Sequence, residues 1–188
     1  MRVLKRALVK WSRYSYERGL TAAFGGNLSV RRGNLIFIKS TGSVMRELTT
    51  ETIATITLKG EITSSLTPSS EYRLHLRIYK KRPDVLAIAH LHPLSSIVVS
   101  TLFKKNEVPL VTPEAKLYLK KLPVVPFREA GSEELAIEVA KSLEKTDAVL
   151  MEKHGIVTIG RTLREAVYKA ELVEENCTLI LRSLTGLT

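Results

Sequence analysis

The chain has 188 residues, of which 44% are hydrophobic and 26% charged, as in an ordinary globular protein, and we expect a single domain over 1–188. No apolar run approaches the roughly 20 residues that a transmembrane helix needs, and the one cysteine, Cys177, excludes an intrachain disulfide and a thiolate metal cluster. The net charge of +10 first suggests nucleic-acid binding, but the basic residues are scattered, without interleaved aromatic residues or a recognition motif, so we expect a solvated surface that steers small anions, and neither a nucleic-acid nor a membrane partner.

The N-terminal segment 2–18 carries apolar residues at helical spacing and is expected to be the first helix. It lacks the continuous apolar stretch and the small-residue cleavage site of a secretory signal, and an amphipathic organelle presequence is the weaker alternative. The single cysteine fits the reducing cytoplasm. Three glycines within 19–27 then interrupt the helix.

The next segments have strand-like patterns. Segment 28–40 alternates in polarity on both sides of Gly33 and Asn34, which predicts a hairpin. A loop over 40–43 follows, and then a strand over 52–60 with a turn at Gly60–Glu61 that leads to a second short strand.

Helices and strands alternate through the rest of the chain. Segment 68–83 predicts a helix capped by Ser69 or Ser70 and ended by Pro83, and the apolar segment 84–92 predicts a central strand. The remaining expectations are a helix over 93–103, extended pieces at 108–114 and 122–127 on either side of a loop, an amphipathic helix over 131–145, two strands over 147–160 hinged near His154–Gly155, and a helix over 162–183. This pattern, without internal repeats, predicts a layered α/β fold.

Three of the four histidines are placed as metal ligands could be. His90 and His92 lie two apart at the end of the predicted central strand and would share one face. His154 lies 62 residues beyond His92, at the hinge of the other strand pair. Catalytic zinc often has three protein ligands plus water or substrate, and imidazole is a common ligand. The alternative is three ordinary polar residues at strand ends.

Glu71 favours the metal interpretation. It lies in the first turn of the predicted helix, where the helix dipole stabilises a carboxylate. Beside a metal it could be a fourth ligand or a proton-transfer base, and the alternative is a glutamate that only stabilises the helix. His75, four residues later on the same helix face, is expected to support the site or the core rather than to bind the metal.

Three short stretches have the chemistry of an anion cradle. The stretch 25–27 (GGN) can bring backbone N–H groups close to a ligand, and 40–42 (STG) adds a hydroxyl and an exposed amide. The stretch 69–71 (SSE) adds two hydroxyls at a helix N-terminus. Each stretch by itself is typical of an ordinary turn or helix cap, but their occurrence together with the histidines supports one common anion-binding site.

Five motifs in order, GLTAAFGGNLSVR, KSTGSVMREL, PSSEYRLH, AHLHP and EKHGIV, resemble the class II sugar-phosphate aldolases and epimerases of the fuculose-phosphate aldolase and ribulose-phosphate 4-epimerase type. The resemblance runs from about residue 4 to about residue 181. It implies a three-layer αβα fold with a mostly antiparallel central sheet. It also implies a homotetramer with the active site at a subunit junction.

The resemblance implies a role for each matching residue. It places a divalent metal, usually zinc, on His90, His92 and His154, with Glu71 as the catalytic glutamate that also approaches the metal. Manganese or cobalt stays open, because imidazole suits several metals. The positions implied to bind the substrate phosphate are Gly26, Asn27, Thr41, Gly42, Ser69 and Ser70. The implied activity is cleavage or formation of small ketose 1-phosphates, similar to fuculose 1-phosphate, through a dihydroxyacetone phosphate enediolate.

The loop after the histidine pair departs from the family pattern. Fuculose-phosphate aldolases carry a tyrosine there, contributed by a neighbouring subunit, whereas this chain has Thr112, Pro113 and Glu114, and Tyr118 comes too late. Glu114 is either the replacement acid or a plain surface glutamate. A glutamate in this loop resembles the related methylthioribulose-phosphate dehydratases, but those lack the glutamate that this chain has at position 71.

Three functions therefore stay open at the level of the sequence. A zinc aldolase is favoured by Glu71, and an epimerase or dehydratase on the same scaffold is the first alternative. The epimerase is weakened by the absence of aspartate in 108–130. A non-catalytic basic module that binds nucleic acid or anions is the second alternative, and it would bind without metal and lose affinity steeply with salt.

Overall fold

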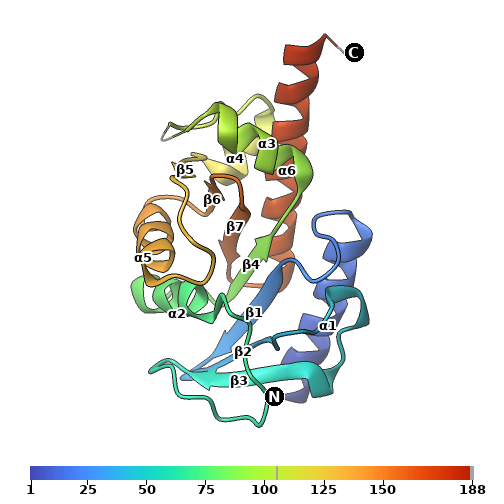
Figure 1. The fold of residues 1–188 in the computed structure, drawn as a ribbon, viewed down its shortest axis with the longest axis vertical. Helices are drawn as coiled ribbons and strands as arrows, with labels where there is room; N and C mark the ends of the chain where they lie inside the picture. Colours follow the sequence, from blue (N-terminus) through green and yellow to red (C-terminus); the bar gives the residue numbers. More distant parts are fainter. Residues whose placement is uncertain (105, 187–188) are drawn as a thin grey trace.

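A seven-stranded mixed sheet forms the centre of the structure (Figure 1). The computed structural model describes residues 1–104 and 106–186, so residues 105, 187 and 188 of the expected domain lie outside the described part. The strand order is β3-β2-β1-β4-β7-β6-β5, and all neighbouring pairs are antiparallel except β5 with β6. The strands are β1 (Asn27–Arg32), β2 (Leu35–Lys39), β3 (Ile53–Thr57), β4 (Ala87–Leu91), β5 (Val124–Val125), β6 (Ala148–Met151) and β7 (Gly155–Gly160).

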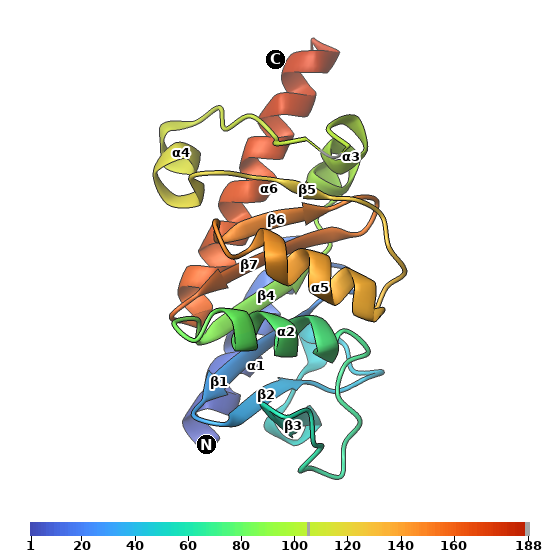
Figure 2. The same ribbon diagram turned by 90° about the vertical axis from the view of Figure 1, so that its left-hand side faces the viewer.

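Helices cover both faces of this sheet. They are α1 (Arg2–Glu17), α2 (Tyr72–Lys81), α3 (Leu94–Leu102), α4 (Pro113–Leu119), α5 (Glu133–Ser142) and α6 (Leu163–Thr185), with short 3-10 turns at Met45–Glu47 and Thr50–Thr52. Helices α2 and α5 lie on one face, in front of the sheet in Figure 2, and the other four pack on the opposite face. The expected three-layer α/β fold with a mostly antiparallel sheet is confirmed.

Strand β4 joins the two halves of the sheet. All five of its residues are buried, as its apolar sequence predicts. Because side chains alternate across a strand, Ala87 and Ala89 enter the apolar core under α6 while Ile88 enters the core under α2 and α5. The same alternation places His90 on the α2 side, opposite Asn27 of β1 in the ladder.

Three local expectations were wrong. Segment 113–119, expected to be the end of an extended piece and the loop after it, forms α4. Pro113 is pre-set for the first helical position, and the Thr112 hydroxyl accepts a hydrogen bond from the Ala115 N–H. The strand expected after Gly60 is only an isolated bridge between Ile56 and Ile62. Helix α2 begins at Tyr72, later than expected, so that the serines at 69 and 70 precede it.

No helix of the described residues is long and apolar enough to cross a membrane.

Candidate active site

A cavity of about 280 Å³ lies where β1, β2, β4 and β7 meet the start of α2. Every predicted site residue except Glu114 lines it. Its walls also include Gly25 of the expected 25–27 stretch, and three residues that the sequence analysis did not select, namely Phe24, Lys39 and Ala130. The sheet therefore gathers segments that are up to about 130 positions apart in the chain, from Phe24 to His154, around one hollow.

Three histidine rings converge in this cavity. Each ring offers one nitrogen to a common point: these ligand atoms of His90, His92 and His154 all lie within 4.8 Å of one another. The Nε2 atoms of His90 and His92 are 2.9 Å apart. His90 lies in β4 and His92 directly follows that strand. His154 directly precedes β7, and the pairing of β4 with β7 brings it beside the other two rings.

The rings have the charge state that a metal requires. Burial lowers the pKa of His90 far below its usual value, lowers that of His92 to about 4, and lowers that of His154 as well. All three are therefore neutral near pH 7. His90 Nδ1 donates to the Ile156 carbonyl over 3.0 Å, which leaves the Nε2 lone pair aimed at the other rings. Tetrahedral zinc needs ligand nitrogens about 3.3 Å apart, so this chain's donor set fits a divalent ion.

Glu71 provides a buried carboxylate beside the rings. Its side chain is 7% exposed, and its Oε2 lies 3.7 Å from His90 Nε2. Neither carboxylate oxygen has a hydrogen-bond partner of normal geometry among the described residues. Burial raises the pKa of this carboxyl, and the nearby Gly131 N–H offsets only part of the effect. A buried carboxylate that lacks a hydrogen-bond partner among the described residues is costly, which indicates that a cation or a proton-donating substrate completes the site.

Two glycines allow the backbone segments to approach this closely. A Cβ on Gly155 would lie 2.3 Å from the Leu91 carbonyl oxygen, so no other residue fits between β7 and β4 beside the histidines. The hinge expected near His154–Gly155 lies slightly earlier in the chain, because the residue with positive φ there is Lys153. Gly26 has a φ of +70°, and a Cβ there would lie 3.1 Å from the His90 carbonyl oxygen.

The three stretches of the expected anion cradle meet at the mouth of the cavity. Ser69 N–H donates to the Lys39 carbonyl, so the serine stretch lies against the end of β2. The Thr41 hydroxyl donates to the Pro68 carbonyl over 2.8 Å and its N–H donates to the Thr67 carbonyl, so the exposed amide expected of stretch 40–42 is not that of Thr41. The N–H groups of Gly42 and Ser70 have no acceptor among the described residues and remain available to an anion.

Lys39 is the cation of the cradle. It is only 4% exposed, and its ammonium group donates to the carbonyl oxygens of Phe24 and Ser43. These two bonds join the glycine loop to the loop after β2 and leave one N–H of the ammonium group for a ligand. Burial lowers the pKa of Lys39. The sequence signal was a lysine at the end of an otherwise apolar strand, directly before Ser-Thr-Gly.

Glu114 lies apart from the other predicted residues. It is exposed in the first turn of α4 and does not line the cavity of its own chain. The position of Glu114 in its own chain therefore lends no support to the expectation that it is the replacement acid.

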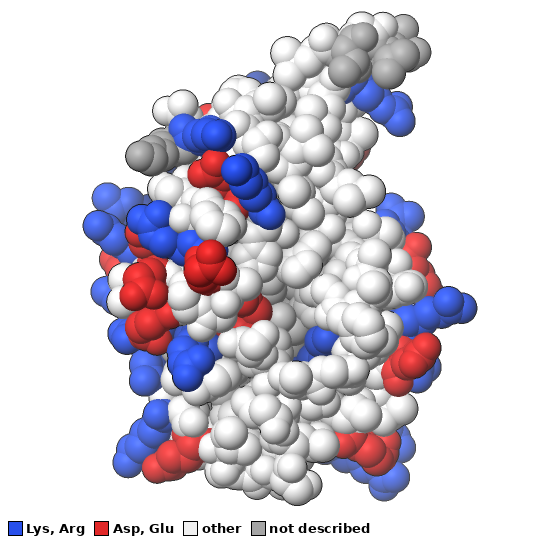
Figure 3. Space-filling view, viewed as in Figure 1, with Lys and Arg blue, Asp and Glu red and all other residues white. Residues whose placement is uncertain are grey.

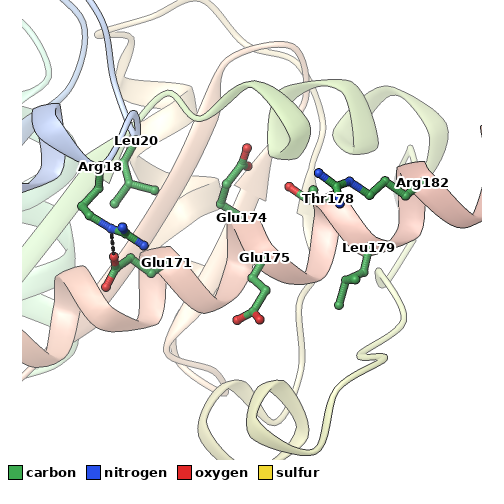
Figure 4. A pocket seen from close by; sticks show the side chains of 8 residues that line it. All are labelled: Arg18, Leu20, Glu171, Glu174, Glu175, Thr178, Leu179 and Arg182. Atoms are coloured by element: carbon green, nitrogen blue, oxygen red, sulfur yellow. Dashed lines mark hydrogen bonds and ion pairs between the residues drawn. The ribbon is translucent and has the colours of Figure 1, made fainter. Parts of the chain in front are cut away.

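A larger groove runs along α6 without comparable chemistry (Figure 4). Its Arg18 and Glu171 already form an ion pair at 2.6 Å. Glu174 accepts hydrogen bonds from the backbone N–H groups of Ser95 and Ser96 at the start of α3. Glu171 and Glu174 therefore connect α6 to neighbouring segments. The histidine cavity remains the better candidate for the active site.

Charged side chains do not form a basic face in the view of Figure 3. Lys and Arg lie among Asp and Glu along both sides of the molecule, and a broad strip without charge runs between them. Ion pairs such as Arg82–Asp84 and Arg128–Glu138 neutralise part of the basic charge. This distribution disfavours the nucleic-acid alternative on this face.

The comparisons with known proteins match nearly the whole chain. The family model of the Class II Aldolase and Adducin N-terminal domain matches residues 6–181. A protein of Methanocaldococcus jannaschii named L-fuculose phosphate aldolase is 41% identical over 180 residues, covering 96% of this chain and 97% of the relative. A protein of Haemophilus influenzae named 3-oxo-tetronate 4-phosphate decarboxylase is 33% identical, covering 93% and 85%. The crystal structure of L-fuculose-1-phosphate aldolase from Thermus thermophilus superimposes with a TM-score of 0.89 at 27% identity, covering 98% of this chain and 97% of that one.

Proposed function

Because the chain belongs to the family of the class II aldolase and adducin N-terminal domain, we propose that it acts as one domain and as a metal-dependent aldolase on small ketose 1-phosphates of the fuculose 1-phosphate kind. One observation carries this proposal: three neutral imidazoles and a buried carboxylate share a cavity with an anion cradle, and the carboxylate has no hydrogen-bond partner of normal geometry among the described residues. The expected location is the cytoplasm.

The cavity residues have separate roles in metal binding and proton transfer. His90, His92 and His154 would hold the divalent ion, with zinc preferred and manganese or cobalt as alternatives. When bound, this ion supplies a Lewis acid that stabilises negative charge on the carbonyl oxygen of the substrate. Glu71 takes a proton from the carbon next to that carbonyl in the synthetic direction and returns it after cleavage. Its raised pKa favours this exchange, because the carboxylate is poorly solvated.

The cradle would bind the phosphate group of dihydroxyacetone phosphate. Lys39 supplies a positive charge, the N–H groups of Gly42 and Ser70 and the Asn27 amide supply donors, and the serine hydroxyl at position 70 adds another. An anion surrounded by N–H donors and one buried cation is bound without a large desolvation penalty. These groups therefore support phosphate binding independently of the metal site.

A decarboxylase is the second candidate, because one relative carries that name at 33% identity. Both reactions break a carbon–carbon bond beside a carbonyl and leave an electron pair that a Lewis acid stabilises. The same cavity therefore suits either one, and the substrate decides between them.

The test is a direct assay of carbon–carbon bond formation. Metal-loaded protein is mixed with dihydroxyacetone phosphate and a short aldehyde, and products are followed by NMR and mass spectrometry. A new ketose phosphate supports the aldolase. Release of carbon dioxide from 3-oxo-tetronate 4-phosphate without aldol product assigns the decarboxylase, and no reaction in either assay, with salt-sensitive nucleic-acid binding in the absence of metal, contradicts both.

The proposed homotetramer, with the site at a subunit junction, is supported by the surface of α3. Leu94, Val98 and Leu102 recur every four residues on this helix and are 76%, 48% and 54% exposed. The helix begins two residues after His92, and the strip without charge in Figure 3 includes it. An apolar helix face of this kind is typical of a protein interface. Across such a junction Glu114 could protonate the new alkoxide.

Substitution Leu94→Asp is therefore expected to shift the protein from tetramer to smaller species, because it buries a charge in the interface. Light scattering after size-exclusion chromatography measures the mass. The control is Ile62→Asp, since Ile62 is 52% exposed beyond β3 at the edge of the sheet. A tetramer that persists in Leu94→Asp, or a monomeric wild-type protein, contradicts the assignment of this face.

A further inference from the structure

Four buried polar side chains connect the cavity to the interface between β1 and α2. Asn27 and Ser29 lie two apart on β1 and share one face, and His75 and Tyr79 lie four apart on α2. Each is at most 3% exposed. The distances are 2.6 Å from His75 Nε2 to Asn27 Oδ1, 2.7 Å from Ser29 Oγ to His75 Nδ1, and 2.8 Å from Ser29 Oγ to the Tyr79 hydroxyl.

The donor and acceptor in each of these hydrogen bonds follow from the chemistry of the four side chains. Asn27 Oδ1 can only accept, so His75 Nε2 must carry the ring proton. Burial lowers the pKa of His75 to about 3, so the ring is neutral and its Nδ1 is an acceptor. The Ser29 hydroxyl therefore donates to Nδ1, and the Tyr79 hydroxyl donates to Ser29. In the reverse order the Tyr79 hydroxyl would have no acceptor among the described residues.

These hydrogen bonds determine which end of the Asn27 side-chain amide faces the cavity. Because Oδ1 is held by His75, the NH2 group is the end left for a ligand, and it makes no hydrogen bond among the described residues. Asn27 lines the cavity beside Gly26 and opposite His90. A rotated amide would present its oxygen to an anion, which is repulsive instead of attractive.

We propose that His75 is a positioning residue for anion binding: its Nε2–H holds the Asn27 carbonyl oxygen so that the amide NH2 faces the phosphate group of the substrate. This proposal rests on the proposed function of the cavity as a phosphate cradle. It also explains why a fully buried histidine outside the three-histidine group lies on α2, the helix that begins two residues after Ser70.

Two variants of the same helix separate positioning from packing. His75→Phe keeps an aromatic ring but removes the donor, so the affinity for inorganic phosphate is expected to fall about tenfold, as for the loss of one well-placed hydrogen bond to a charged group. Tyr79→Phe removes the far end of the chain and leaves the His75–Asn27 bond, so phosphate affinity is expected to stay within about twofold of wild type. Titration calorimetry at matched metal content measures both.

A double-mutant cycle then tests whether His75 acts through Asn27. In the Asn27→Ala background the further change His75→Phe is expected to leave phosphate affinity unchanged, whereas independent effects would add. His75→Gln, which retains an N–H donor, is expected to restore part of the affinity. With the natural substrate, His75→Phe is expected to raise KM more than it lowers kcat, because phosphate is bound in the ground state and transition state alike.

Proton-detected NMR of the wild-type protein does not depend on any variant folding. The His75 ring is expected as the Nε2–H tautomer, and the Asn27 side-chain NH2 signals are expected to shift on titration with phosphate. An Nδ1–H tautomer, or equal phosphate affinity in His75→Phe and wild type, overturns the positioning role while the proposed function stands. Failure of the wild-type protein to bind phosphate overturns the cradle itself and the positioning role with it.

Discussion

Replacement His92→Ala is expected to remove nearly all activity, by about a thousandfold or more, together with the bound metal. His92 is the suitable ligand to change, because it follows β4 and is half-buried, whereas His90 is fully buried within the sheet. A site with two remaining imidazoles holds a divalent ion weakly, and the Lewis-acid contribution of several kcal/mol is lost with the ion. A thousandfold loss corresponds to about 4 kcal/mol of activation free energy.

Metal content measured by atomic absorption distinguishes this mechanism from simple unfolding. The wild-type protein is expected to gain thermal stability when zinc is added, since a ligand that binds only the folded state raises the unfolding midpoint. His92→Ala is expected to fold but to show little of this gain. Full activity in a metal-free His92→Ala protein would refute the role of the three rings.

Replacement Glu71→Gln is expected to lower kcat by about 10²–10⁴-fold while the metal is retained. The amide has nearly the shape of the carboxylate but cannot take a proton, and all three histidines remain. In the metal-free protein near pH 8 the free energy of unfolding is expected to rise by about 1 kcal/mol, because a neutral group replaces a buried charge that has no hydrogen-bond partner of normal geometry among the residues described. Higher stability with lower activity is the signature of a catalytic group.

The matched control is Glu134→Gln in the exposed first turn of α5, which changes the same charge outside the cavity. It is expected to retain wild-type kcat and to change stability by no more than about 1 kcal/mol. Glu71→Gln with kcat within tenfold of wild type would show that another group moves the proton. Loss of metal from Glu71→Gln would instead show that the carboxylate is mainly a ligand.

Local pattern was sufficient for most elements of the fold. Alternation around Gly33 predicted the β1–β2 hairpin, and the apolar run 84–92 predicted the buried strand β4. The helices expected over 131–145 and 162–183 correspond to α5 and α6. Helix α4 was missed, because its seven residues are too few for helical periodicity and only Thr112–Pro113 marks its start. Its packing against α6 is a tertiary contact.

Site residues could be predicted where several of them are grouped in motifs, but not where a single residue contributes alone. The residues of the cradle and the histidines stood out by their grouping, whereas Lys39 looked like an ordinary lysine at a strand end. Its importance depends on burial and on two carbonyl partners from different loops. The polarity of the Asn27 amide likewise depends on His75, 48 positions away in the chain.

The sequence by itself determined which side chains could do the chemistry and which local element carries each: a histidine pair at the end of a strand, a glutamate at the start of a helix, and glycine and serine stretches suited to an anion. Only the tertiary structure decided that these groups share one cavity. The register of β4 against β7 places His154 beside the pair, and the packing around the start of α2 buries the Glu71 carboxylate without a hydrogen-bond partner of normal geometry in the described part of the chain. Sheet pairing and desolvation join residues far apart in the chain, so no local stretch encodes either of them.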